Sequence, residues 1–149
     1  MKRISLLLTT LILCSIAFGQ PPRPNKKMRE QIKAEKIAFI ASEVDLTPEE
    51  AQVFWPIYNK YESEISTIRK QRRTYFEELK NQDKLTDERA YELMELLFKS
   101  EQAESKVRLS YLAKFSSVLG KKKAAIVFIS EEKFKHKLLD KLREEHPRR

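Results

Sequence analysis

The chain has 149 residues and a formal net charge of +8, with 30 lysines and arginines against 22 acidic residues. Its single cysteine excludes an intramolecular disulfide, and two glycines are too few for a glycine-rich loop that cradles phosphates. With two histidines and no His-x-x-x-His, Cys-x-x-Cys or Gly-x-Ser-x-Gly pattern, the sequence predicts no catalytic residues, no metal ligands and no cofactor. We therefore do not expect an enzyme.

The first 19 residues have the pattern of a secretory signal peptide. Lys2 and Arg3 form a positive start, and the run from 4 to 18 is mostly apolar. Ala17 and Gly19 supply the small residues of a cleavage site before Gln20. We therefore expect export to the periplasm, where nucleic acid is not an expected partner.

Two other interpretations of this segment are weaker. An uncleaved membrane anchor is disfavoured because the apolar run is shorter than the roughly 20 residues that a span needs. A lipid anchor on Cys14 is disfavoured because Leu13, before it, is large where lipidation motifs have a small residue. Cleavage before residue 20 remains the prediction.

Residues 20–25 contain three prolines and are expected to form a flexible, extended leader. Residues 26–145 are rich in Glu, Lys, Leu, Ala and Arg, and proline and glycine are rare there. Such a composition favours a single all-α domain over 26–145. Its first helix is predicted at 26–43, where apolar residues recur with helical spacing.

A complete helix-start signal follows. Thr47 can cap the first turn, Glu50 completes a capping box three residues later, and Pro48 occupies the first helical position, where no N–H is needed. Leu46, just before the cap, can pack against the new helix as a hydrophobic staple. The second helix is predicted at 48–80.

Pro56 lies inside this second helix and is expected to kink it, because proline removes one backbone hydrogen bond. Phe54, Trp55 and Tyr58 surround the proline with aromatic side chains. They form either a corner of the core or a binding hollow. The core corner is favoured because large aromatic side chains supply much of the burial in small domains.

The start signal recurs at Leu85-Thr86, and a third helix is predicted from there to 118. Its apolar stripe is thin between Ser100 and Glu104, which indicates that this part faces solvent or a partner. Gly120 is expected to end the helix in the left-handed conformation.

A fourth helix is predicted at 122–145, followed by a frayed basic tail at 146–149. The second and third helices, of about thirty residues each, would be on the order of 45–50 Å long, too long to wrap a round core of this size. We therefore predict an elongated helical hairpin of four helices with a kinked second helix, and a cradle-like homodimer that completes the burial.

The adjacent glutamates at 49–50, 77–78 and 131–132 could be imagined as acid–base pairs. Neighbouring residues on a helix do not face each other, so these pairs are not suited to acid–base chemistry. We expect them to lie on the surface and to favour helix ends electrostatically.

The densest basic cluster of the predicted helices comprises Arg69, Lys70, Arg72 and Arg73, and it adjoins Tyr75 and Phe76. The candidate client contacts are Arg69, Arg72, Arg73, Tyr75 and Phe76. These five residues form either a client-docking surface of cations and aromatics or a solvated face. A basic exported domain suits acidic client proteins or an anionic membrane surface.

The openings at Leu46-Thr47 and Leu85-Thr86, in an exported, basic, all-helical chain, resemble those of the Spy/CpxP periplasmic proteins, which carry a Leu-Thr-x-x-Gln motif. The segment Phe54-Trp55-Pro56-Ile57-Tyr58 resembles the core of a Bacteroidota branch often described as periplasmic heavy-metal sensors or sensors of extracytoplasmic-function sigma factors. The motif glutamine is replaced here by Glu50 and Arg89, and the histidines with which some members bind zinc or nickel are missing.

This resemblance covers about residues 28–145 and implies a dimeric helical cradle that holds unfolded clients or reports envelope stress. The first hypothesis is therefore an ATP-independent periplasmic stress protein that binds unfolded or misfolded envelope proteins. The alternative is a regulatory adaptor that docks a membrane-bound anti-sigma factor or sensor kinase. Metal sensing ranks below both, because the expected mature chain has no cysteine and two histidines.

Overall fold

The computed structural model describes residues 26–145, which contain four α-helices and no β-strand. The helices are α1 (Lys26–Val44), α2 (Pro48–Leu79), α3 (Asp87–Leu119) and α4 (Lys121–Glu145), and a 3₁₀ turn, η1 (Gln82–Lys84), joins α2 to α3. The predicted all-α class and the four predicted helices are confirmed. The predicted signal peptide at 1–19, leader at 20–25 and tail at 146–149 lie outside the described residues.

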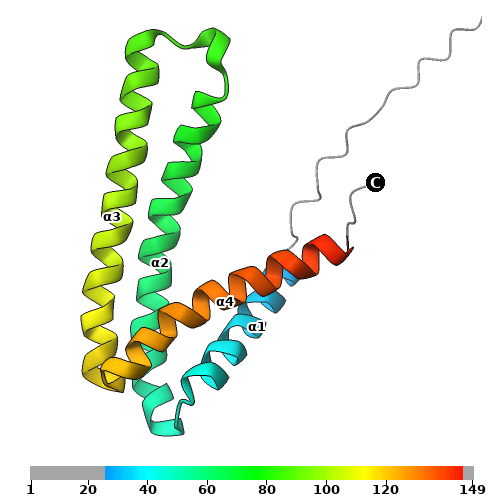
Figure 1. The fold of residues 1–149 in the computed structure, drawn as a ribbon, viewed down its shortest axis with the longest axis vertical. Coiled ribbons are helices and arrows are strands. Elements are labelled where there is room, and N and C mark those ends of the chain that lie inside the picture. Colours follow the sequence, from blue (N-terminus) through cyan, green and yellow to red (C-terminus); the bar gives the residue numbers. More distant parts are fainter. Residues whose placement is uncertain (1–25, 146–149) are drawn as a thin grey trace, which may run out of the picture.

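The four helices form two arms that meet at one end (Figure 1). α2 and α3 run antiparallel as one long hairpin, and α1 and α4 pair antiparallel as a second, shorter arm. At 1.5 Å per residue, the 32 residues of α2 make the long arm about 48 Å. The arms diverge from the shared end, so the molecule is elongated and V-shaped.

The two predicted helix starts are capped, but not equally. The Thr47 hydroxyl accepts from the Glu50 amide at 3.2 Å, and the Glu50 carboxylate accepts from the Thr47 amide at 3.0 Å, which completes the capping box. The Thr86 hydroxyl accepts from the Arg89 amide at 3.2 Å, but an arginine cannot return the bond. Arg89 instead pairs with Glu78, at 2.7 and 2.9 Å, and so links the far ends of α2 and α3.

α2 continues through Pro56 as one helix, so the proline does not interrupt it. Proline has no backbone N–H, so the Gln52 carbonyl lacks the hydrogen bond that residue 56 would otherwise donate. Gln52 and Pro56 are both exposed, and water can therefore bind this carbonyl. Phe54 and Tyr58 are buried, and Trp55 packs against the core from a half-buried position. The aromatic segment is therefore a corner of the core, as favoured above.

Two single residues make the sharp turns near the shared end of the arms. Asp45 has a φ of 53° and follows α1 directly, and the half-buried Leu46 after it packs on the core. Gly120 has φ 80° and ψ 159°, which is not the left-handed helical conformation predicted, because this one residue joins α3 directly to α4. Lys123 donates to the Asp45 carbonyl and to Glu50, each at 2.7 Å, and so fastens α4 to the turn between α1 and α2.

An aromatic cluster fills the place where the arms meet. Phe115 has no exposed surface and packs against five other rings. Ring centroids that are neighbours in the cluster lie 5.2 to 6.1 Å apart, the range of favourable aromatic pairs. We call this cluster the aromatic junction; its members come from α2, α3 and α4 and are Phe54, Tyr58, Tyr61, Tyr111, Phe115 and Phe128.

Glu131 of α4 supplies the polar centre of this region. It accepts hydrogen bonds from Tyr58 at 2.7 Å and Tyr61 at 2.9 Å, and it pairs at 3.2 Å with Lys36 of α1, which also binds Glu62. Burial raises the pKa of both tyrosines, and the negative charge of Glu131 raises it further. The surface position expected for Glu131 is therefore wrong, because one carboxylate here joins three helices.

Candidate functional site

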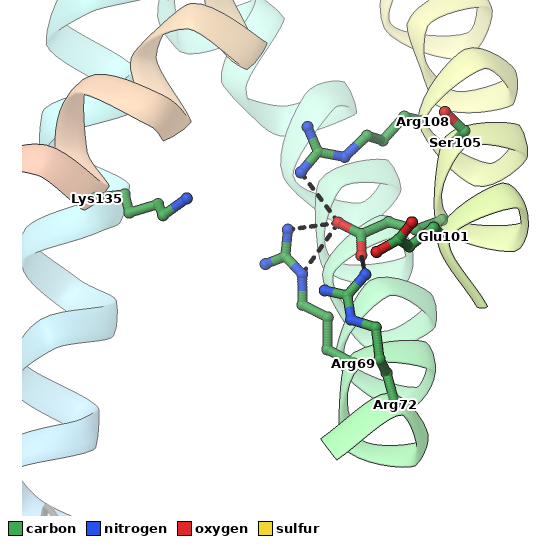
Figure 2. Close-up of a pocket in the computed structure, with 7 residues that line it drawn as sticks. Arg69, Arg72, Glu101, Ser105, Arg108 and Lys135 are labelled. Carbon is green, nitrogen blue, oxygen red and sulfur yellow. Dashed lines mark hydrogen bonds and ion pairs between the residues drawn. The ribbon is translucent and has the colours of Figure 1, made fainter. Parts of the chain in front are cut away.

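The basic cluster predicted on α2 lies on the inner side of the V. In Figure 2, Arg69 and Arg72 extend from α2 and Arg108 from α3, and Lys135 of α4 points toward them from the second arm. These side chains line an open recess of about 550 Å³. We call it the arginine recess; it is lined by Arg69, Arg72, Glu101, Glu104, Ser105, Arg108 and Lys135.

Glu104 of α3 holds the three arginines together, although it is only 7% exposed. Its Oε1 accepts from Arg69 Nε at 3.1 Å, from Arg69 Nη2 at 2.8 Å and from Arg108 Nη2 at 3.1 Å. Arg72 Nη1 lies 3.0 Å from Oε2 as an ion pair, without the alignment of a hydrogen bond. One carboxylate thus orients three guanidinium groups.

This arrangement keeps Glu104 ionised. Burial alone would raise the pKa of its carboxyl group. The hydrogen bonds from Arg69 and Arg108, and the positive charges of Arg69 and Arg72, outweigh that effect and lower the pKa below the usual 4.5. Glu104 therefore acts as a fixed counter-ion, which neutralises one of the positive charges and leaves the others.

The arginine recess remains cationic after this pairing. Four basic side chains face the carboxylates of Glu101 and Glu104 in the lining, and Glu132 beside the recess is a third acid. Lys135 has one nearby acid, Glu132, at 3.5 Å, and Ser105 has no hydrogen-bond partner for its hydroxyl within residues 26–145. The recess therefore offers free N–H and O–H donors and a net positive charge, a combination suited to an anionic group.

A second recess of about 390 Å³ adjoins the first and extends toward the tip of the long arm. Arg73 has no ion pair or hydrogen bond to another described side chain, and Phe76 is 49% exposed. We call it the outer recess; it is lined by Arg69, Arg72, Arg73, Phe76, Glu77 and Lys80.

Exposed apolar side chains flank the two recesses. On α3, Met94 and Phe98 lie seven and three residues before Glu101, so they share its side of the helix. On α4, Leu139 and Leu142 lie four and seven residues after Lys135, so they share the side of α4 that carries this lysine. The inner side of the V therefore combines cations with apolar surface.

The structure brings together four of the five residues predicted to bind clients. Arg69, Arg72, Arg73 and Phe76 line the two recesses. Tyr75 is half-buried and outside both, because it precedes Phe76 and points about 100° away around the helix. The residues predicted as motif and structural positions lie at helix caps, at turns and in or against the core.

Sequence reasoning missed the residue that organises the arginines. The polar gap that ends at Glu104 was expected to face solvent or a partner, and this is wrong for Glu104 itself. Leu97, Glu104 and Tyr111 follow one another at spacings of seven and are all buried, so the glutamate occupies a core position. A carboxylate in that register, opposite a helix rich in arginine, was the available signal.

Within residues 26–145, no group of three or more His, Cys, Asp or Glu side chains is placed to hold a metal ion. No helix in that part of the chain combines the length and the apolar character needed to cross a membrane.

Comparison with protein-family models, with curated proteins and with solved structures gives no match. The resemblance to the Spy/CpxP proteins therefore stays a hypothesis, carried by the short motifs at 46–50, 54–58 and 85–86.

Proposed function

We propose that this protein is a non-enzymatic periplasmic protein that binds unfolded or misfolded envelope proteins without ATP, in the angle between its two arms. The observation that supports this best is the composition of the inner side of the V, where two cationic recesses adjoin exposed apolar side chains. Periplasmic location rests on the predicted signal peptide.

Two forces of different range would act on a client. The basic residues attract acidic segments over a distance of about 10 Å at 0.1 M salt. Phe76, Phe98 and Leu139 then contact apolar side chains that an unfolded client exposes. An open surface with few directional apolar contacts tolerates many client sequences. A second copy of the chain would extend this surface, and we propose a homodimer.

The first test is suppression of aggregation. A chemically denatured model protein is diluted into buffer with equimolar amounts of this protein, and light scattering is followed at low salt and at about 0.5 M salt. We expect suppression at low salt that weakens at high salt, because the long-range attraction is screened. Unchanged scattering at low salt would contradict the proposal.

Matched variants locate the client surface. Arg73→Gln and Phe76→Ser change exposed residues of the outer recess that make no core contact, so the fold should tolerate them. Lys70→Gln and Val53→Ser remove the same kinds of side chain from exposed positions outside both recesses. We expect the first pair to reduce suppression and the second pair to leave it unchanged.

The alternative proposal is a regulatory adaptor that docks a membrane-bound anti-sigma factor or sensor kinase. The fixed geometry of the three arginines around Glu104 favours it, because a preorganised cluster suits one defined acidic partner. Chemical cross-linking in envelope preparations separates the two proposals. An adaptor should yield one dominant partner, and a client-binding protein should yield many.

A further inference from the structure

The three guanidinium groups of the arginine recess have far more donors than their shared carboxylate can accept. Each guanidinium carries five N–H donors. Glu104 receives two contacts from Arg69 and one each from Arg72 and Arg108. A further contact of Arg108, to Glu132, is 3.9 Å long. Most donors of this cluster are therefore free to bind a ligand.

The cluster is also preorganised. Because Glu104 is buried and fixed, the guanidinium groups converge before any ligand arrives, and their ordering does not have to be achieved on binding. Lys135 faces them from the second arm, and Ser105 adds a hydroxyl without a partner in the described chain (Figure 2). Donors thus surround the recess from three helices.

The number and charge of these donors distinguish between anions. A carboxylate has two oxygens and one negative charge. A phosphate monoester has three terminal oxygens and a charge of about −1.5 to −2 at pH 7. Three separate guanidinium groups can each contact a different oxygen of such a group, and arginine binds phosphate through paired N–H donors. Four basic side chains against three nearby carboxylates, those of Glu101, Glu104 and Glu132, leave a net positive charge that favours an anion.

We propose that the arginine recess is a binding site for a phosphate monoester or inorganic phosphate, held by Arg69, Arg72, Arg108 and Lys135. The phosphate can belong to a soluble compound or to the headgroup of a lipid, and the recess chemistry is the same for both. This assignment does not depend on client binding, which the outer recess and the flanking apolar residues can serve alone.

Calorimetric titration with inorganic phosphate, at constant ionic strength maintained with chloride, tests the site. Acetate serves as the carboxylate control. We expect saturable one-site binding of phosphate and much weaker binding of acetate. No saturable signal with phosphate or with the vesicles described below would overturn the proposal, and so would equal affinity for acetate and phosphate.

Two exposed residues of the recess should change the affinity in opposite directions. Lys135→Gln removes a cation and should weaken phosphate binding about fivefold, whereas Glu101→Gln removes a repelling charge and should strengthen it about threefold. Lys70→Gln, on α2 but outside both recesses, should change it less than twofold. Equal effects of Lys135→Gln and Lys70→Gln would show attraction by net charge alone and overturn the site.

Arg72→Gln and Arg108→Gln should weaken binding at least about tenfold, because both groups touch the fixed carboxylate and the ligand. Circular dichroism would verify that each variant is folded. If either is not, the variants at the exposed positions still decide the result, since neither of those side chains is part of the core.

Vesicles identify the source of the phosphate. Phosphatidylcholine vesicles with and without about one fifth phosphatidic acid, a lipid phosphate monoester, are sedimented with the protein. Cosedimentation that requires phosphatidic acid and that Lys135→Gln weakens more than Lys70→Gln assigns the site to a lipid headgroup. Binding of inorganic phosphate without cosedimentation assigns it to soluble phosphate compounds.

Discussion

Both the aromatic junction and the outer half of the α2/α3 hairpin contain parts of α2 and α3, but different interactions hold the two helices together in the two regions. At the junction, rings from three helices surround the fully buried Phe115. In the outer half only two helices meet, with Leu93 and Leu97 of α3 buried between them and the Arg89–Glu78 ion pair near the tip. Burial is therefore concentrated at one end of the long arm.

This difference separates stability from recognition. Two helices alone cannot cover each other's surface, so the outer half must leave side chains exposed on both sides. The side that faces the second arm carries the two recesses and exposed residues such as Phe98. Substitutions at the junction should therefore affect folding most, and substitutions on the inner side of the arm should affect binding most.

The largest effect is expected from Phe115→Ala. Removing the ring from the centre of the aromatic junction leaves a cavity and should lower the free energy of unfolding by about 4 kcal/mol. Phe98→Ala removes the same ring from a position that is 57% exposed and should cost less than about 0.5 kcal/mol. Urea unfolding followed by circular dichroism measures both free energies. Similar losses for the two variants would contradict the view that burial is concentrated at the aromatic junction.

Glu131→Ala should follow, with a loss of about 3 kcal/mol. The substitution leaves the buried hydroxyls of Tyr58 and Tyr61 without their acceptor and removes an ion pair to Lys36. The neighbouring Glu132→Ala removes a more exposed carboxylate and should cost about 0.5 kcal/mol or less. Equal losses in urea unfolding would mean that Glu131 does not hold the arms together.

Tyr111→Phe should lower stability by about 1.5 kcal/mol near pH 8, because it removes a hydrogen bond to the Glu64 carboxylate. Burial and that carboxylate raise the pKa of Tyr111 to about 12 from its usual 10.0. The folded state therefore favours the neutral phenol, and this contribution is complete below pH 10 and lost as the pH rises through 12. Between pH 10 and 12 the free energy of unfolding should fall more for the wild type than for Tyr111→Phe. If the two proteins show the same pH dependence in urea unfolding, the hydrogen bond does not make this contribution.

The smallest effects are expected at the helix caps. Thr47→Ala breaks a complete capping box next to the junction and should cost about 1 kcal/mol. Thr86→Ala removes one cap bond at the tip, where the reciprocal bond is missing, and should cost about 0.5 kcal/mol. Thr47→Ser should restore most of the loss in thermal unfolding. A larger loss of stability from Thr86→Ala than from Thr47→Ala would mean that the cap at the tip contributes more than the cap next to the junction.

The sequence alone determined the helices and the places where they begin and end. Thr47, Glu50 and Pro48 specify a helix start through contacts that span three residues, and Gly120 marks a break through its own backbone. Such signals act between near neighbours in the chain, so they can be recognised without knowledge of the fold. The pairing of long helices into an extended hairpin followed from their lengths and short connections.

Only the tertiary structure decided where the buried charges lie. Glu104 meets Arg69 across 35 positions of sequence, and Glu131 meets Tyr58 across 73. The seven-residue spacing of Glu104 from Leu97 and Tyr111 indicates a buried position, but the sequence does not give the partners of either glutamate, because only the packing of the arms brings them within hydrogen-bond distance. A carboxylate becomes stable in a buried position only when those distant donors compensate its lost hydration, and that compensation is a property of the assembled helices.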